Sequence, residues 1–532
     1  MKEKTNNKGF FKLNGVILLL FIILVSLLAW ITYGTVAGVF GMVSYLIIGW
    51  IGLFPWIIPI VGIFLGILDL AGILNFGIYG LSLNLSHLNS SWMSVFWFLI
   101  TSMIGVLIDI FLTIVIIVKI KDVLDKNKGV KKNLALINCT VIDGNLDSSP
   151  IENAVILIKN LSKVKDTIDN LYTDEQTGII TEVGKSKEIK IPPDYKKIDL
   201  KGKYVLPGII NAHCHLMGSG KPTKLMKLSD KWINRLIKFL DTPIGKWLLF
   251  NMMKKNALNA LNAGITTLRT MSDPLFIDLK LRDKINDGKI LGPRLMCAGK
   301  GICITGGHGF FASHIADSVP EVRKGVRTNL REEVDVIKIL STGGVMDARK
   351  VGEAGRPQMT IEEIETACFE AHRGNLLVAT HCESTKGIEE ALKGGVDTIE
   401  HGAEIPEDLI PLFKENPKAL RGYTALIPTV SAGMGLATLP AEVTKITDVK
   451  RENAKLIEKG MIKGLQIAYE NGIEFGVGTD ASVPYSTHYE VWKELKYFMK
   501  YTKMIAKEAI YRATKKNAEI LGIDDITGSI EP

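Results

Sequence analysis

The stretch that decides the fold is LPGIINAHCHL, residues 206–216. A proline–glycine turn signal precedes a short apolar run, and the run ends in two histidines one residue apart. Because side chains alternate along a strand, His213 and His215 point to the same side of it. The stretch is therefore predicted to be a β-strand that presents two imidazoles at one end.

The pattern around this stretch repeats along the rest of the chain. Apolar runs of strand length alternate with amphipathic helices, which is typical of βα units and a parallel sheet. The eight runs are YVLPGIINAHCH, GITTLRTM, RLMCAGKGI, VDVIKILSTGG, LLVATHCES, TIEHGAEI, ALIPTVSA and IEFGVGTDAS. Helices are predicted at residues 361–373 and 451–470, the second ending at Asn471-Gly472. Residues 204–532 are thus expected to form an α/β domain, a (β/α)8 TIM-type barrel.

A smaller β unit is expected to precede the barrel. The runs LALINCTVID, NAVILIKN and GIITEVG are short, rich in β-formers and separated by Asn, Asp and Gly. They place this unit at residues 133–203.

The first quarter of the chain is of another kind. Residues 13–119 are nearly all apolar, and up to Val118 the acidic, basic and histidine side chains among them are Asp69, His87 and Asp109. A bilayer span needs about 20 apolar residues. The region therefore has room for three or four transmembrane helices.

Charge at the two ends of this region predicts its topology. Residues 1–12 and the basic linker 120–132 are rich in lysine, and the loops between them carry no lysine or arginine. Positive residues stay on the cytoplasmic side. Both ends are therefore expected in the cytoplasm, which favours four spans and predicts a multi-pass protein of the cell membrane with a cytoplasmic catalytic domain.

Composition excludes some classes of function. The net charge is +8, but the lysines are scattered and form no basic block interleaved with aromatic residues, so nucleic acid is not expected as a partner. The six cysteines form no CxxC pair or regular framework. This favours a reducing compartment over a secreted disulfide scaffold.

Polar residues recur at the ends of the predicted strands. His381, His401 and Asp480 each close an apolar run, as His213 and His215 do. Active sites of barrels lie at this end of the strands. A single histidine in such a place is more often structural, but four histidines and one aspartate converging on one rim suit Zn²⁺.

Lys338 lies inside the fourth run, between two isoleucines. Burial lowers the pKa of a lysine and frees its amine. A free amine can react with carbon dioxide to form a carbamate that bridges two metal ions. The alternative is a lysine whose amine reaches the rim of the barrel.

Together these motifs resemble the amidohydrolase superfamily, and within it the prolidase and imidazolonepropionase-related metal-dependent hydrolases. The landmarks, in order, are VLPGIINAHCHL, ITGGHG, VDVIKILSTGG, DTIEHG, GTDA and AIYRATKKNAEILGI followed by GSIEP. The resemblance covers about residues 134–532. It implies a barrel beside a small β-sandwich and hydrolysis of an amide bond by a hydroxide that bridges two zinc ions.

The resemblance also implies roles for single residues. The metal ligands would be His213, His215, carboxylated Lys338, His381, His401 and Asp480. Asp480 would accept the proton of the attacking water and pass it to the leaving amine. His308 and His488 match positions that line the family's pocket, and the substrate would be a small-molecule amide, a dipeptide or N-acyl amino acid.

The sequence departs from the family pattern in three places. The fifth strand has HCES where relatives often have HAHG, so Glu383 replaces a histidine and is expected to alter substrate choice. Relatives continue beyond GSIEP into strands that complete the sandwich, which is therefore expected to be incomplete. The hydrophobic region, residues 13–119, is not part of the usual pattern.

Two other functions fit the sequence less well. A mononuclear deaminase or cyclic-amide hydrolase would leave Lys338 without a role. A catalytically dead membrane binding protein would have lost ligands, yet all six positions are intact. A homo-oligomer is compatible with any of these functions.

The predicted topology is directly testable. A reporter fused directly after Lys132 should be active in the cytoplasm, because the lysines on both sides of the apolar region resist translocation. A reporter found outside the cytoplasm would exclude an even number of spans.

Overall fold

The computed structural model describes residues 132–161, 178–222, 230–444 and 446–532. The predicted membrane spans lie in residues 13–119, outside the described residues. None of the described helices combines the length and the apolarity that crossing a bilayer requires.

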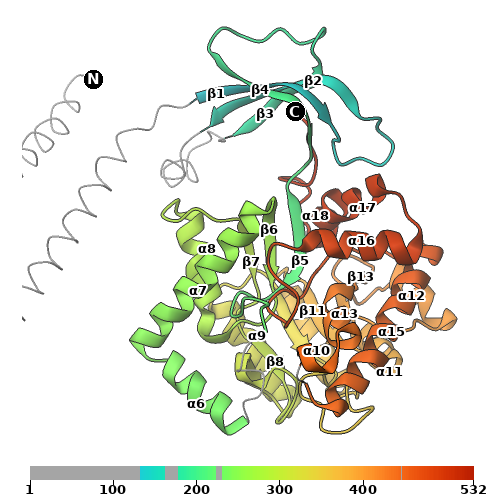
Figure 1. Ribbon diagram of the computed structural model, residues 1–532. Helices are drawn as coiled ribbons and strands as arrows, with labels where there is room; N and C mark the ends of the chain where they lie inside the picture. The colour runs from blue at the N-terminus through green and yellow to red at the C-terminus, as the bar shows by residue number, and fades with distance from the viewer. Residues whose placement is uncertain (1–131, 162–177, 223–229, 445) are drawn as a thin grey trace, which may run out of the picture. The chain divides into compact units, whose positions relative to one another are not determined.

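The first described element is a four-stranded sheet with the order β3-β2-β1-β4 (Figure 1). Its strands are β1 (Lys132–Val141), β2 (Ile151–Leu161), β3 (Ile179–Lys185) and β4 (Tyr195–Val205). β1 pairs antiparallel with β2 and parallel with β4. The sequence analysis identified three of these strands and missed β4, because most of its residues are polar and exposed.

This sheet is joined to the end of the chain. Ile530 packs into the same apolar cluster as Cys139 and Ile156, and its N–H donates to the carbonyl of Asp143 at 2.9 Å. The carbonyls of the loop that follows β1 also accept hydrogen bonds from Lys507 of a later helix.

The remaining strands pair in parallel in two sheets, with the orders β5-β6-β7 and β13-β12-β11-β10-β8-β9. They are β5 (Ile209–Cys214), β6 (Ile265–Thr270), β7 (Arg294–Cys297), β8 (Gly301–Cys303), β9 (Ser313–Ile315), β10 (Ile337–Leu340), β11 (Val378–Cys382), β12 (Thr398–His401) and β13 (Ala425–Ile427).

Main-chain hydrogen bonds link the two sheets on both sides. On one side, the N–H of Asp335, just before β10, donates to Cys297 of β7 at 2.8 Å. On the other, residues 474–481 lie between β13 and β5, with Leu426 N–H donating to Glu474 and Ala212 N–H to Val477, each at 2.9 Å. The predicted α/β class is thereby confirmed. Closure into a (β/α)8 barrel stays a prediction, which these links favour.

Two of the eight predicted runs differ from the structure. Residues 294–302 form two short strands, because Gly299 adopts a left-handed backbone (φ +60°) next to the ring of Phe276 and breaks the extended chain. Residues 473–482 form isolated bridges and no strand of their own, and Asp480 there also has a left-handed backbone (φ 50°).

Helices follow the strands and surround them (Figure 1). They are α6 (Asp230–Leu240), α7 (Pro243–Asn262), α8 (Ile277–Asn286), α9 (Val319–Arg331), α10 (Ile361–Arg373), α11 (Thr385–Gly394), α12 (Ile410–Lys414), α13 (Val430–Thr438), α14 (Ala441–Thr444), α15 (Asp448–Asn471), α16 (Val491–Thr502), α17 (Ala506–Ala513) and α18 (Lys515–Leu521), with short 3₁₀ turns η4 (Pro274–Phe276), η5 (Phe310–Ala312) and η6 (Glu407–Leu409).

The two helices predicted from sequence are confirmed. α10 begins at the predicted residue with a capping box, in which Thr360 and Glu363 satisfy each other's main-chain N–H groups. α15 begins three residues earlier than predicted, and Gly472 ends it with a left-handed backbone (φ 65°).

Gly478 allows the segment before Asp480 to pack directly behind His213. A Cβ added there would lie 2.5 Å from Ile427 Cγ2 and 2.7 Å from His213 Cβ. Gly478→Ala should therefore lower the free energy of unfolding by about 1–3 kcal/mol. Gly433→Ala is the control, since its Cβ would lie 3.4 Å from Glu458 Cβ in ordinary contact. Equal urea denaturation midpoints for the two variants would contradict this packing.

Candidate active site

His213 and His215 approach the same carboxylate from one strand end. His213 is the fifth residue of β5, and His215 follows the strand directly. The Nδ1 of His213 donates to Glu400 Oε2 at 2.6 Å, and the Nδ1 of His215 to the carbonyl of Ser272 at 3.3 Å. Their Nε2 atoms lie 3.4 and 3.1 Å from Asp480 Oδ1. Both rings thus turn their Nε2 atoms toward one point.

His401 and Asp480 reach that point from other elements. Ligand atoms of His213, His401 and Asp480 all lie within 4.8 Å of one another. His401 and Asp480 have left-handed backbones (φ 70° and 50°), which cost of order 1–3 kcal/mol each and persist where the surroundings impose them. The Nδ1 of His401 is within hydrogen-bond distance of Thr429 Oγ1, at 2.7 Å, which fixes the ring.

His381 of β11 extends the cluster. Its ring centroid lies 4.6 Å from that of His401, and its Nε2 lies 3.4 Å from the carbonyl of Gly343. His308 stacks on the other side of His381, with centroids 4.2 Å apart, and forms an ion pair with Asp347. All four strand-end histidines predicted from sequence therefore lie in one continuous group.

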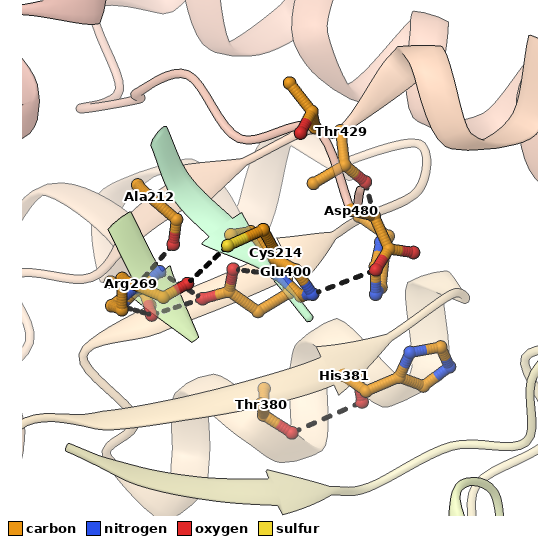
Figure 2. A network of polar contacts seen from close by, with 12 residues as sticks. Ala212, Cys214, Arg269, Thr380, His381, Glu400, Thr429 and Asp480 are labelled. Atoms are coloured by element: carbon orange, nitrogen blue, oxygen red, sulfur yellow. Dashed lines mark hydrogen bonds and ion pairs between the residues drawn. The ribbon is translucent and has the colours of Figure 1, made fainter. Parts of the chain in front are cut away.

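A buried charge network supports the cluster from below. Glu400 is fully buried and accepts from Arg269 at 2.8 Å as well as from His213 (Figure 2). Arg269 also donates to the carbonyl of Ala212 at 2.5 Å and to the hydroxyl of Thr398 at 3.1 Å. Burial alone would raise the pKa of Glu400, but the charge of Arg269 and the bond from His213 outweigh it and hold that pKa well below its usual value.

Burial sets the protonation of the remaining groups. It holds the pKa of His381 and of His401 well below the usual range, so both rings are neutral. It also lowers the pKa of Lys338 to about 8, against the opposing charges of Glu400 and Asp480. The amine of Lys338 is buried and makes no hydrogen bond with any other described residue. Neutral imidazoles and a free amine are the forms that bind metals and react with electrophiles.

The donor set fits a metal ion. Imidazole nitrogens and a carboxylate oxygen converge on one point, since the Nε2 atoms of His213 and His215 lie 3.4 and 3.1 Å from the buried Oδ1 of Asp480. Nitrogen and oxygen ligands of this kind suit zinc. The carboxylate behind His213 is the outer partner that metal-binding histidines usually have.

The three residues proposed to contact substrate lie at different depths. Glu383 Oε2 is buried, has no hydrogen-bond partner in the part of the chain that the structure describes, and lies 3.9 Å from His381 Nε2. His488 is buried, and its Nε2 donates to the carbonyl of Gly218, in the loop after β5, at 2.7 Å. Burial lowers the pKa of His488 to about 4. His308 is partly exposed.

The sequence analysis missed Glu400, Arg269 and Thr429. A signal for two of them was present. Glu400 and Arg269 are charged residues inside short apolar runs predicted to be buried strands. Buried charges are tolerated when they are paired, so opposite charges on two such strands indicate an internal pair.

The chain belongs to the amidohydrolase family, whose model matches residues 204–532, more than half of the sequence. With the relatives below, this membership makes the protein a hydrolase that acts on carbon–nitrogen amide bonds.

Solved and curated relatives support the assignment. A protein from Bifidobacterium longum assigned as a prolidase is 36% identical, with a TM-score of 0.63 over 76% of this chain and 86% of its own. A Xaa-Pro dipeptidase with bound methionine is 28% identical, with a TM-score of 0.60 over 75% and 91%. The ochratoxinase of Aspergillus niger is 26% identical over 63% of this chain and 67% of its own.

The carboxylate behind His213 gives a direct test of the site. Glu400→Gln should weaken zinc binding about 10–100-fold, because the amide no longer supports the imidazole with a negative charge. Glu404→Gln, an exposed position on the same segment, should bind zinc like the parent protein. Competition with a fluorescent zinc chelator measures both, and an unchanged zinc affinity in Glu400→Gln would show that His213 is not a ligand.

Proposed function

We propose that this protein is a membrane-anchored, zinc-dependent hydrolase that cleaves the amide bond of a dipeptide or N-acyl amino acid. The observation that carries the proposal is the buried, unpartnered amine of Lys338 beside the cluster of His213, His401 and Asp480. A structural lysine would be expected to have a carboxylate or carbonyl partner. An amine without one is suited to chemical modification.

The modification that fits is carboxylation. The neutral amine of Lys338 would attack carbon dioxide, form a nitrogen–carbon bond and release one proton, leaving an anionic carbamate. Burial favours this reaction because it lowers the pKa of the amine to about 8, so that about half of it is unprotonated near pH 8. The carbamate would join His213, His215, His381, His401 and Asp480 as a ligand.

Each ligand set would hold one of two zinc ions. His213 and His215 from β5 would serve one, and His381 and His401 from β11 and β12 the other, with Lys338 shared. Bound zinc would supply a Lewis acid for the carbonyl and lower the pKa of the attacking water.

Asp480 would move the proton. Burial raises the pKa of Asp480, but the adjacent rings of His213 and His215 outweigh this and hold it well below its usual value, so the group is a carboxylate at neutral pH. It would accept the proton of the attacking water as the carbon–oxygen bond forms. It would then return that proton to the leaving nitrogen as the carbon–nitrogen bond breaks.

Substrate choice would depend on groups at the rim of the site. His308, His488 and Glu383 are proposed as contacts, and Glu383 would offer a buried carboxyl oxygen 3.9 Å from His381 Nε2. The apolar residues 13–119 would anchor this cytoplasmic domain to the cell membrane.

The proposed activity is tested by loading the full chain with zinc and assaying Xaa-Pro dipeptides, other dipeptides and N-acyl amino acids. Release of a free amine from at least one class, abolished by a chelator and restored by zinc, is expected. Deamination, or hydrolysis of a cyclic amide, with no cleavage of these linear amides would favour the mononuclear alternative instead.

Substitution of Lys338 separates a bridging carbamate from a lysine that supplies positive charge. Lys338→Ala should lose at least one zinc and nearly all activity, and Lys338→Arg should fare no better although it keeps the charge. Acetate or formate should partly restore both zinc content and activity in Lys338→Ala, because a small carboxylate can take the carbamate's place.

The opposite pattern would reject the carbamate. If Lys338→Ala retains two zinc ions per chain and full activity, no bridge is formed by this residue. Milder effects in Lys338→Arg, with no response to acetate, would assign it a role as a cation.

A further inference from the structure

The pair of helices that follows β5 carries a concentration of exposed apolar side chains. Trp232 and Phe239 of α6 are 54% and 47% exposed, and Ile244 and Trp247 of α7 are 67% and 63% exposed. Large apolar side chains gathered on one surface mark an interaction site more often than single ones do. We call this set, with Leu248 and Met252 of α7, the α6–α7 surface.

The exposed residues of α7 form a stripe. Ile244, Leu248 and Met252 follow one another at intervals of four residues and Trp247 is three residues from Ile244, so they lie on one face of the helix. The opposite face is also apolar and packs into the core through residues such as Leu249. A helix that is apolar on both faces is normally covered on both. The outer face of α7 departs from this rule, because its apolar stripe is exposed and no other described residues cover it.

The charges around this stripe are mostly positive. Between residues 230 and 255 the chain has two acidic residues, Asp230 and Asp241, and Asp241 forms an ion pair with Lys246 at 2.7 Å. The basic residues in the same segment are Lys231, Arg235, Lys238, Lys246, Lys254 and Lys255. The guanidinium of Arg235 stacks on the ring of Trp232 at 4.6 Å. Tryptophan, aliphatic residues and flanking lysines are typical of helices that lie in a membrane interface.

The surface is connected to the rim of the candidate active site. α6 packs against η5, which begins two residues after His308. Asn256 of α7 donates to the carbonyls of Leu216 and Gly218, both at 2.9 Å, in the loop that follows His215. Contacts made by α6 and α7 thus lie next to the mouth of the site.

We propose that the α6–α7 surface docks on a lipid bilayer that carries anionic headgroups, with Trp232 and Trp247 at headgroup level. The excess of basic residues selects this partner over a second copy of the chain, which would bring the same positive charges together. The proposal goes beyond amide hydrolysis and concerns a surface outside the candidate active site.

Site-directed spin labelling of the full chain in nanodiscs tests this docking. A nitroxide is attached at Leu248→Cys, which is practicable because all six native cysteines are buried. The matched control is Phe369→Cys on α10. Phe369 is exposed and has Arg373 over its ring, as Trp232 has Arg235. Collision of each label with oxygen, which concentrates in lipid, and with a water-soluble nickel chelate is measured in phosphatidylcholine discs with and without phosphatidylglycerol.

The docked surface predicts a distinct result for each label. In discs containing phosphatidylglycerol, the label at 248 should collide mainly with oxygen, and the label at 369 mainly with nickel. A label at 248 that remains open to nickel would overturn the proposal. A label at 248 shielded from both reagents would also overturn it, because the cover would then be protein, either a second copy or another segment of this chain.

A triple variant tests whether docking requires the basic residues of α6. Lys231→Gln, Arg235→Gln and Lys238→Gln combined should weaken docking on the anionic discs roughly a hundredfold, and so restore collision of the 248 label with nickel. Unchanged oxygen collision in this triple variant would contradict docking on anionic lipid.

Discussion

The candidate site depends on one buried interaction, the carboxylate of Glu400 held between the guanidinium of Arg269 and the imidazole of His213. It joins β12, β6 and β5 through their side chains. Removing one partner of such a pair typically costs about 3–5 kcal/mol, because an uncompensated charge stays buried. The same carboxylate accepts the Nδ1 proton of His213, which fixes the tautomer and turns the Nε2 toward Asp480.

The backbone at the ends of the strands orients the remaining candidate ligands. Glu400 and His401 are neighbours in β12, yet one faces the charge network and the other the cluster, since successive side chains alternate. The left-handed backbones of His401 and Asp480 then turn the chain at the point where the ligands meet. Stabilisation of the fold and orientation of the ligands thus come from the same few residues.

The fold class, two helices and the strand-end histidines could be predicted from sequence, whereas the buried charge network was not. The alternation of apolar runs and amphipathic helices predicted the α/β class, and α10 and α15 have strong caps. Glu400 was missed because its partner lies 131 residues away, and pairing over that distance leaves no local pattern. The run at residues 473–482 was read as a strand because its apolar residues alternate, whereas in the structure it forms isolated bridges and Asp480 has a left-handed backbone.

In the proposed function, the cluster would hold two zinc ions bridged by carboxylated Lys338. Crystals of the zinc-loaded protein, measured on both sides of the zinc absorption edge, test it most directly. Two anomalous peaks are expected, one flanked by His213 and His215 and the other by His381 and His401, with density joining the Lys338 amine to both. A single peak beside an unmodified Lys338 would contradict it.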